Sequence, residues 1–190
     1  MTASPKMVWL VCHGNGGQAA QRGYIRDILP NGDSFYVVEY PGYGSRSGSP
    51  SMQSINEVAA EAYAVVRRLH PNLPVGIVGE SLGSGPASYL CSLTHPPDRV
   101  VLIVPFDNLL SVAQEHFWWL PVALLMRDKW DNSKSLSKYS GRIDIYGAMS
   151  DGVVPVHHAR SLAASLPAAI YHELKCGHND WSGLVRISER

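Results

Sequence analysis

The stretch Val75-Gly-Ile-Val-Gly79-Glu80-Ser81-Leu82-Gly83 decides the fold of this chain. It begins as a short apolar run rich in β-branched residues, which is typical of a buried strand, and it leads into a helical pattern over residues 82–93. A G-x-S-x-G motif between a strand and a helix indicates a sharp turn that exposes the serine hydroxyl. Glycines are needed two positions either side, because larger side chains would collide in such a turn, and Gly85 would let the helix pack close to the sheet. We therefore interpret Ser81 as a nucleophile; the alternative is that it only caps the helix.

Five further runs of the same kind surround this motif, at residues 7–12, 35–39, 100–104, 143–146 and 170–174. They do not alternate between apolar and polar residues, which indicates strands that are buried on both faces. Helical patterns separate them, and the clearest begins at Ser54, with Glu57 as a capping-box partner. The sequence predicts an α/β fold with three layers and a mainly parallel sheet of about six strands.

Chemistry is expected in the loops that follow the carboxyl ends of these strands. A nucleophilic serine needs a histidine as a base and a carboxylate that orients the histidine. Asp151 follows the fifth run and His178 follows the sixth, so the order along the chain is Ser81, Asp151, His178. Asp107, after the fourth run, is the alternative acid, although it can also be a cap for a helix that starts at Asn108. His157 and His158 are expected to begin a helix and to be solvated.

A glycine-rich loop, His13-Gly14-Asn15-Gly16-Gly17, follows the first run. We expect the backbone N–H groups of Asn15 and Leu82 to stabilise a negatively charged oxygen formed by attack of Ser81 on a carbonyl. His13 is expected to order the loop through hydrogen bonds. The spacing Gly14-x-Gly16-x-x-Ala19, with Glu39 ending the next strand, also fits a dinucleotide fingerprint, so an NAD(P)-binding, Rossmann-like protein is an alternative.

These loops, together with Tyr40-Pro41-Gly42-Tyr43-Gly44, give the chain a resemblance to the small α/β hydrolases without a large cap domain, including the group that contains protein depalmitoylating enzymes. The resemblance implies an α/β-hydrolase fold that lacks the first two strands of the family. It also implies a serine esterase or thioesterase that works without cofactor or metal. Arg46 departs from the serine usual at its position, and no acylated, cysteine-rich N-terminus is expected, so the depalmitoylating substrate is not carried over.

The segment 105–141 is longer than a simple crossover needs. Its apolar centre, at residues 117–120, favours a helix buried against the sheet over a small lid. If aromatic side chains line an acyl pocket, the candidates are Tyr43, Phe106, Trp118 and Trp119. We expect a single domain over residues 1–190.

Composition limits the partners. The 16 basic and 16 acidic residues cancel, which gives no reason to expect nucleic acid or an anionic membrane as a partner. The N-terminal apolar run at residues 7–12 is too short for a signal-peptide core, and the longest run, at residues 117–126, is too short for a membrane span. The three cysteines form no recognisable disulfide framework, so a cytoplasmic location is expected. The expected partner is a small ester or acyl substrate. A catalytically inactive binding protein with the same fold is the alternative to an enzyme.

Overall fold

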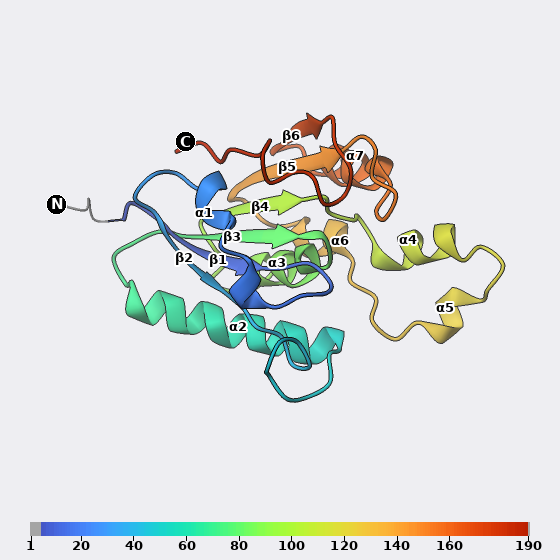
Figure 1. The fold of residues 1–190 in the computed structure, drawn as a ribbon, viewed down its shortest axis with the longest axis horizontal. Helices are drawn as coiled ribbons and strands as arrows, with labels where there is room; N and C mark the ends of the chain where they lie inside the picture. The colour runs from blue at the N-terminus through green and yellow to red at the C-terminus, as the bar shows by residue number, and fades with distance from the viewer. Residues whose placement is uncertain (1–4, 190) are drawn as a thin grey trace.

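The computed structural model describes residues 5–189 and contains one sheet of six parallel strands in the order β2-β1-β3-β4-β5-β6 (Figure 1). The strands are β1 Val8–Cys12, β2 Ser34–Val37, β3 Val75–Glu80, β4 Arg99–Ile103, β5 Arg142–Ala148 and β6 Ala169–Leu174. Each of the six predicted strands is confirmed, with ends that differ by no more than two residues. Parallel strands put all of their carboxyl ends at one edge, where the loops with the candidate residues meet.

Helices cover one face of the sheet. Buried side chains of β1, β3, β4 and β5, including Leu10, Ile77, Leu102 and Ile145, pack there into one apolar cluster. Residues of five helices join this cluster: α2 Met52–Leu69, α3 Ser84–Cys91, α4 Leu109–His116, α6 Asn132–Leu136 and α7 Val156–Ser165.

The other face is covered mostly without helices. Its apolar cluster contains Trp9, Val78 and Ile103 from the sheet. The short helix α1 Ile25–Ile28, which follows the 3-10 turn η1 Ala19–Gln21, packs against it. The remaining cover comes from Trp181, Val185 and Ile187 of the irregular C-terminal segment. The third layer is therefore present, but much of it is irregular chain.

The long helix α2 begins earlier than predicted. Ser51, not Ser54, is its N-cap: the Ser51 side chain accepts a hydrogen bond from the backbone N–H of Ser54, and the Ser54 hydroxyl accepts one from the backbone N–H of Ser51. Serine at both positions satisfies the capping box, so Glu57 is not needed there and instead accepts from Gln53 at 2.8 Å.

The segment after β4 extends beyond the carboxyl ends of the strands as α4 Leu109–His116 and α5 Val122–Leu125 (Figure 1). The expectation that its apolar centre is buried is wrong, because Trp118 is 80% exposed and Trp119 is 61% exposed. The segment is instead held by Trp130, which is buried against Gly85 and donates a hydrogen bond from Nε1 to Asn56 at 2.9 Å. Gly85 thus makes room for this indole ring, not for the sheet as predicted.

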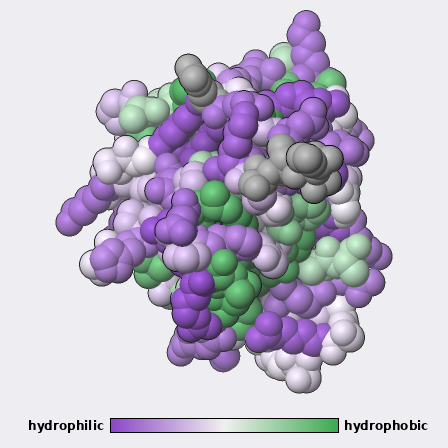
Figure 2. All heavy atoms as spheres, turned by 90° about the vertical axis from the view of Figure 1, so that its left-hand side faces the viewer, coloured by the Kyte–Doolittle hydropathy of each residue, from purple (hydrophilic) through white to green (hydrophobic). Residues whose placement is uncertain are grey.

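The opposite face, at the amino ends of the strands, is mostly hydrophilic, with a small group of hydrophobic residues near its centre (Figure 2). Arg99 at the start of β4 donates two hydrogen bonds to Asp144, and Arg142 donates two more. Burial opposes ionisation of Asp144, but the hydrogen bonds from Arg142 and Arg99 hold the pKa of its carboxyl group below the usual value. This end of the sheet is thus closed by a buried ion-pair network.

Candidate active site

Ser81 lies in the predicted turn at the end of β3, inside the 3-10 turn η2 Ser81–Gly83. Its φ of 50° is in the left-handed region, which a residue other than glycine rarely adopts. A Cβ atom at Gly79 would lie 2.6 Å from the Cβ of Ala87, and one at Gly83 would overlap the backbone carbonyl of Cys12. The two glycines of the motif therefore let the turn pack against β1 and α3.

Ser81 is joined to His178 and Asp151 by two hydrogen bonds. Nε2 of His178 lies 2.9 Å from Oγ of Ser81, and Nδ1 of the same ring lies 2.7 Å from Oδ2 of Asp151. The other oxygen of Asp151 accepts the backbone N–H groups of Val153 at 2.8 Å and Val154 at 2.7 Å. Because the carboxylate accepts a hydrogen bond from Nδ1–H, the lone pair of Nε2 is left facing the serine hydroxyl. The three predicted residues thus lie together in the order that proton transfer from serine requires.

Backbone hydrogen bonds bring the Asp151 and His178 loops side by side. Met149 donates to Leu174 at 2.8 Å, and Ser150 donates to Cys176 at 3.0 Å. These bonds continue the ladder between β5 and β6 beyond the strand ends. The side chains of both loops are therefore placed by the sheet itself.

Asp107, the alternative acid, has other partners. Its Oδ1 lies 2.7 Å from Nδ1 of His158, and Asn108, not Asp107, caps α4 by accepting from Leu110 and Ser111. His158 is 4% exposed, so the expectation that it is solvated is wrong, although it holds for the exposed His157. The structure thus contains a second aspartate–histidine pair, separate from the one at Ser81.

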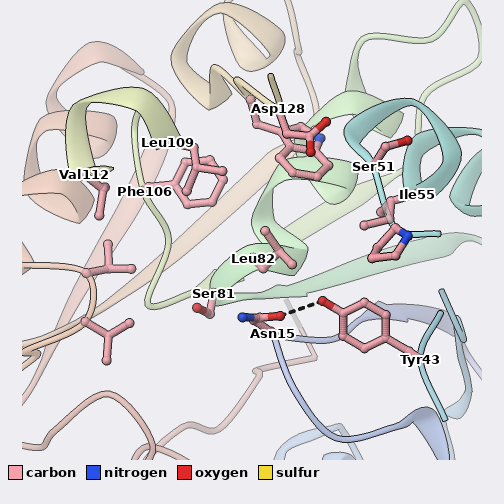
Figure 3. Close-up of a pocket in the computed structure, with 14 residues that line it drawn as sticks. Asn15, Tyr43, Ser51, Ile55, Ser81, Leu82, Phe106, Leu109, Val112 and Asp128 are labelled. Atoms are coloured by element: carbon pink, nitrogen blue, oxygen red, sulfur yellow. Dashed lines mark hydrogen bonds between the residues drawn. The ribbon is translucent and has the colours of Figure 1, made fainter. Parts of the chain in front are cut away.

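The glycine-rich loop after β1 lies against the serine turn. A Cβ atom at Gly14 would be 3.4 Å from the Cβ of Ser81, and the N–H of Gly14 donates to Oε2 of Glu80 at 3.4 Å. Asn15 accepts a hydrogen bond from the Tyr43 hydroxyl at 2.6 Å and points toward Ser81 (Figure 3). Asn15 and Leu82 both line the cavity in front of Ser81. The glycine-rich loop is therefore close enough to Ser81 for its backbone to face a carbonyl group bound in the cavity.

His13 and Glu39 hold the loop from inside. Nδ1 of the fully buried His13 donates to the Gly14 carbonyl at 2.8 Å, and the Tyr40 hydroxyl donates to the His13 carbonyl at 3.0 Å. Glu39, the acid of the dinucleotide alternative, accepts the backbone N–H of Ala19 at 3.0 Å. The Glu39 carboxylate therefore binds the protein's own backbone, at Ala19 just after the glycine-rich loop.

The state of His13 predicts how stability depends on pH. Burial lowers the pKa of its imidazole, and Arg22 acts in the same direction, while the hydrogen bond to Gly14 and the carboxylates Glu39 and Glu80 oppose the shift. The unfolded chain takes up a proton near pH 6.5, whereas the folded protein resists it until lower pH. The free energy of unfolding should therefore fall as pH decreases below about 6.5, by at most about 1.4 kcal/mol per pH unit from this group. Urea unfolding between pH 5 and 8 measures this slope, and His13→Gln should flatten it; equal slopes would contradict the assignment.

A cavity of about 380 Å³ opens in front of Ser81, between α2, α4 and the loops (Figure 3). Tyr43 and Phe106 line it as expected. Trp118 and Trp119 do not, because they lie between α4 and α5 with exposed side chains; their assignment to the pocket is corrected. Sequence reasoning missed the remaining apolar walls and one acid: Pro50, Ile55, Leu109, Val112, Asp128, Trp130, Val153 and Val154. The helical spacing of Ile55 predicts that its side chain is buried, but it does not predict that the side chain lines this cavity.

Comparison with known proteins agrees with this architecture. Residues 9–130 match the sequence model of the alpha/beta hydrolase fold, and the chain belongs to this family of hydrolases. The fold is shared with solved structures. One is Est1E from Butyrivibrio proteoclasticus with bound ferulic acid (TM-score 0.73, 12% identity, 95% of this chain and 85% of that chain). Another is the esterase EaEST from Exiguobacterium antarcticum (TM-score 0.70, 16% identity, 94% and 87%).

Two relatives are similar in sequence. One is the uncharacterized protein Rv2307c of Mycobacterium tuberculosis, which is 32% identical over 179 residues, covering 90% of this chain and 62% of the relative. Another is the lysophosphatidylserine lipase ABHD12 of Mus musculus, 28% identical over 180 residues, covering 84% of this chain and 45% of the relative. The chain thus spans less than two thirds of these relatives. Within residues 5–189 no helix is both long and apolar enough to cross a membrane.

Proposed function

We propose that this protein is a serine hydrolase that cleaves carboxylic ester or thioester bonds through an acyl-enzyme intermediate. The observation that carries the proposal is the continuous set of hydrogen bonds from Ser81 Oγ to His178 and from His178 to Asp151, at 2.9 and 2.7 Å. Distances in this range allow the imidazole to take the serine proton directly.

In the proposed first step, Oγ of Ser81 attacks the substrate carbonyl carbon while Nε2 of His178 takes the hydroxyl proton. Asp151 holds the imidazole in the tautomer with a proton on Nδ1, and it stabilises the imidazolium that forms. The backbone N–H groups of Asn15 and Leu82 would donate to the oxyanion. Collapse of this intermediate breaks the bond to the alcohol or thiol, which leaves with the proton from His178.

In the second step a water molecule attacks the acyl group on Ser81, and His178 removes the proton from that water. The tetrahedral intermediate again places its negative oxygen at the two backbone N–H groups. When it collapses, the carboxylic acid leaves and the proton returns to Oγ of Ser81. The two steps together convert an ester and water into a carboxylic acid and an alcohol, or a thioester and water into a carboxylic acid and a thiol.

The cavity favours an apolar acyl group. Most of its lining is aliphatic or aromatic, including Ile55, Leu109 and Val112, and 380 Å³ is in the range of small-molecule sites. Asp128 also lines the cavity and accepts the backbone N–H of Met52 at 2.7 Å. Because relatives are named as lysophosphatidylserine lipases, lysophospholipid esters belong in the substrate panel with simple acyl esters and thioesters.

Labelling with a fluorophosphonate probe tests the proposal, because the probe phosphonylates an activated serine. We expect one adduct per chain by intact mass, none in Ser81→Ala, and near-normal labelling when the exposed Ser92 is replaced by alanine. Both variants should keep the circular dichroism spectrum of the wild type. Absence of an adduct on folded wild-type protein, or an adduct that persists in Ser81→Ala, would overturn the proposal.

A further inference from the structure

A cluster of histidine and glutamate side chains lies between α4 and α7. Nε2 of His157 is 3.0 Å from Oε2 of Glu115, and Nε2 of His158 is 3.2 Å from the same oxygen. Across residues 5–189, this is the group in which three such ligand atoms come within 4.8 Å of one another. Glu115 comes from α4 and the histidines come from α7, so the cluster joins two separate elements.

Asp107 fixes the orientation of the His158 ring. Its side chain is 5% exposed, and Nδ1 lies 2.7 Å from the carboxylate of Asp107, which accepts a hydrogen bond from Nδ1–H. In the neutral ring, Nε2 therefore carries a lone pair, and this lone pair faces an oxygen of Glu115. Nε2 of His157 approaches the same oxygen, so three atoms that can each bind a metal ion converge at one point.

We propose that Glu115, His157 and His158 bind a zinc ion. Zinc binds histidine nitrogen and carboxylate oxygen at about 2.0–2.1 Å, and a tetrahedron of that size has edges of roughly 3.4 Å, close to the 3.0 and 3.2 Å between the two nitrogens and the Glu115 oxygen. A histidine ligand whose other nitrogen donates to a carboxylate, as His158 does to Asp107, is usual at such sites. His157 has a half-exposed side chain, which can turn to complete the geometry. Water would fill the fourth position.

Zinc at this position would tie the extended segment to the body of the protein. Leu109 and Val112 of α4 line the cavity in front of Ser81, and so do Val153 and Val154 just before α7. His116, next to Glu115, already contacts the Val153 carbonyl at 2.9 Å. The zinc would therefore fix the distance between two walls of the cavity, without sharing a residue with the proposed catalytic set.

Calorimetric titration of tag-free, EDTA-dialysed protein with zinc chloride tests the proposal. We expect one zinc per chain and a higher melting temperature when zinc is present. Glu115→Gln and His157→Asn, both at exposed positions, should weaken binding by about tenfold or more, by comparison with losses at other metal sites. His95→Asn, a change at an exposed histidine outside the cluster, should bind as the wild type does.

Two outcomes would overturn the proposal. Absence of binding would mean that Glu115, His157 and His158 only form polar contacts between α4 and α7. Binding that survives Glu115→Gln but disappears in His178→Asn would place the metal at the serine site instead. Cobalt(II) provides a second measurement: visible bands of a four-coordinate ion without a thiolate charge-transfer band are expected, and a thiolate band would point to a cysteine such as Cys176. Neither readout depends on hydrolase activity, so failure of the zinc site and failure of the proposed function are distinguishable.

Discussion

Ser81→Ala is expected to lower kcat/KM for the best ester substrate by roughly 10⁴-fold or more. The variant removes the atom that attacks the carbonyl and leaves the cavity and its hydrogen-bond donors in place, so substrate binding should change little. His178→Ala should cause a loss of similar size, because the base and the nucleophile act as one unit. For the same reason, the double variant should be about as slow as either single one. Steady-state kinetics of the three variants, with a chromogenic ester, measure these ratios.

The two aspartates provide a matched control for this prediction. Asp151→Asn should lower turnover by about 10⁴-fold, because an amide favours the wrong tautomer of His178. Asp107→Asn makes the same chemical change at the Asp107–His158 pair and should leave turnover within a few-fold of wild type. If Asp107→Asn caused the larger loss in a folded protein, the acid would be misassigned, and the order of Ser81, Asp151 and His178 in the chain would not reflect the mechanism.

Much of the fold could be predicted because its signals are local. Each strand is a short apolar run, and runs buried on both faces imply a parallel sheet. A parallel sheet collects the loops after its strands at one edge, so residues as distant in sequence as Ser81 and His178 could be expected to meet. The glycines at positions 79 and 83 could also be predicted locally, because a side chain at either position would collide with the tightly packed turn.

The features that were mispredicted depend on partners that the local pattern does not specify. An apolar stretch such as Phe117-Trp118-Trp119-Leu120 shows that burial is favourable, but not what would bury it, and the structure leaves it exposed. The cavity walls come from α2, α4 and the loop before α7, which no single motif connects. Likewise, His158 is buried because Asp107 from another loop pairs with it, a contact that spans 51 positions in the sequence.

Gly83→Ala is expected to lower the free energy of unfolding by about 3 kcal/mol, at the upper end of the usual cost of overpacking. The backbone of Gly83 is helical, with φ of −63°, so alanine itself is compatible with the conformation. The cost comes from the neighbour: the new Cβ atom would overlap the backbone carbonyl of Cys12 in β1 and lie 2.7 Å from the His13 carbonyl oxygen. Cys12 ends β1, which is paired on both sides, and His13 follows it directly, so these backbone atoms cannot move away as the end of a flexible side chain would. Urea unfolding followed by tryptophan fluorescence measures the change.

The same substitution should also reduce fluorophosphonate labelling, because relief of the overlap requires the turn to move away from β1 and with it Ser81, whose Oγ must stay close to His178. Gly23→Ala is the matched control: no atom lies within 4 Å of its Cβ position, so stability should change by less than about 0.5 kcal/mol and labelling should be unchanged. If Gly83→Ala kept both wild-type stability and labelling, the close packing of the serine turn on β1 could not be what holds Ser81 in its left-handed conformation. If instead stability fell while labelling of the folded fraction stayed normal, the glycine would serve the fold alone, and the position of Ser81 would be set by its hydrogen bond to His178.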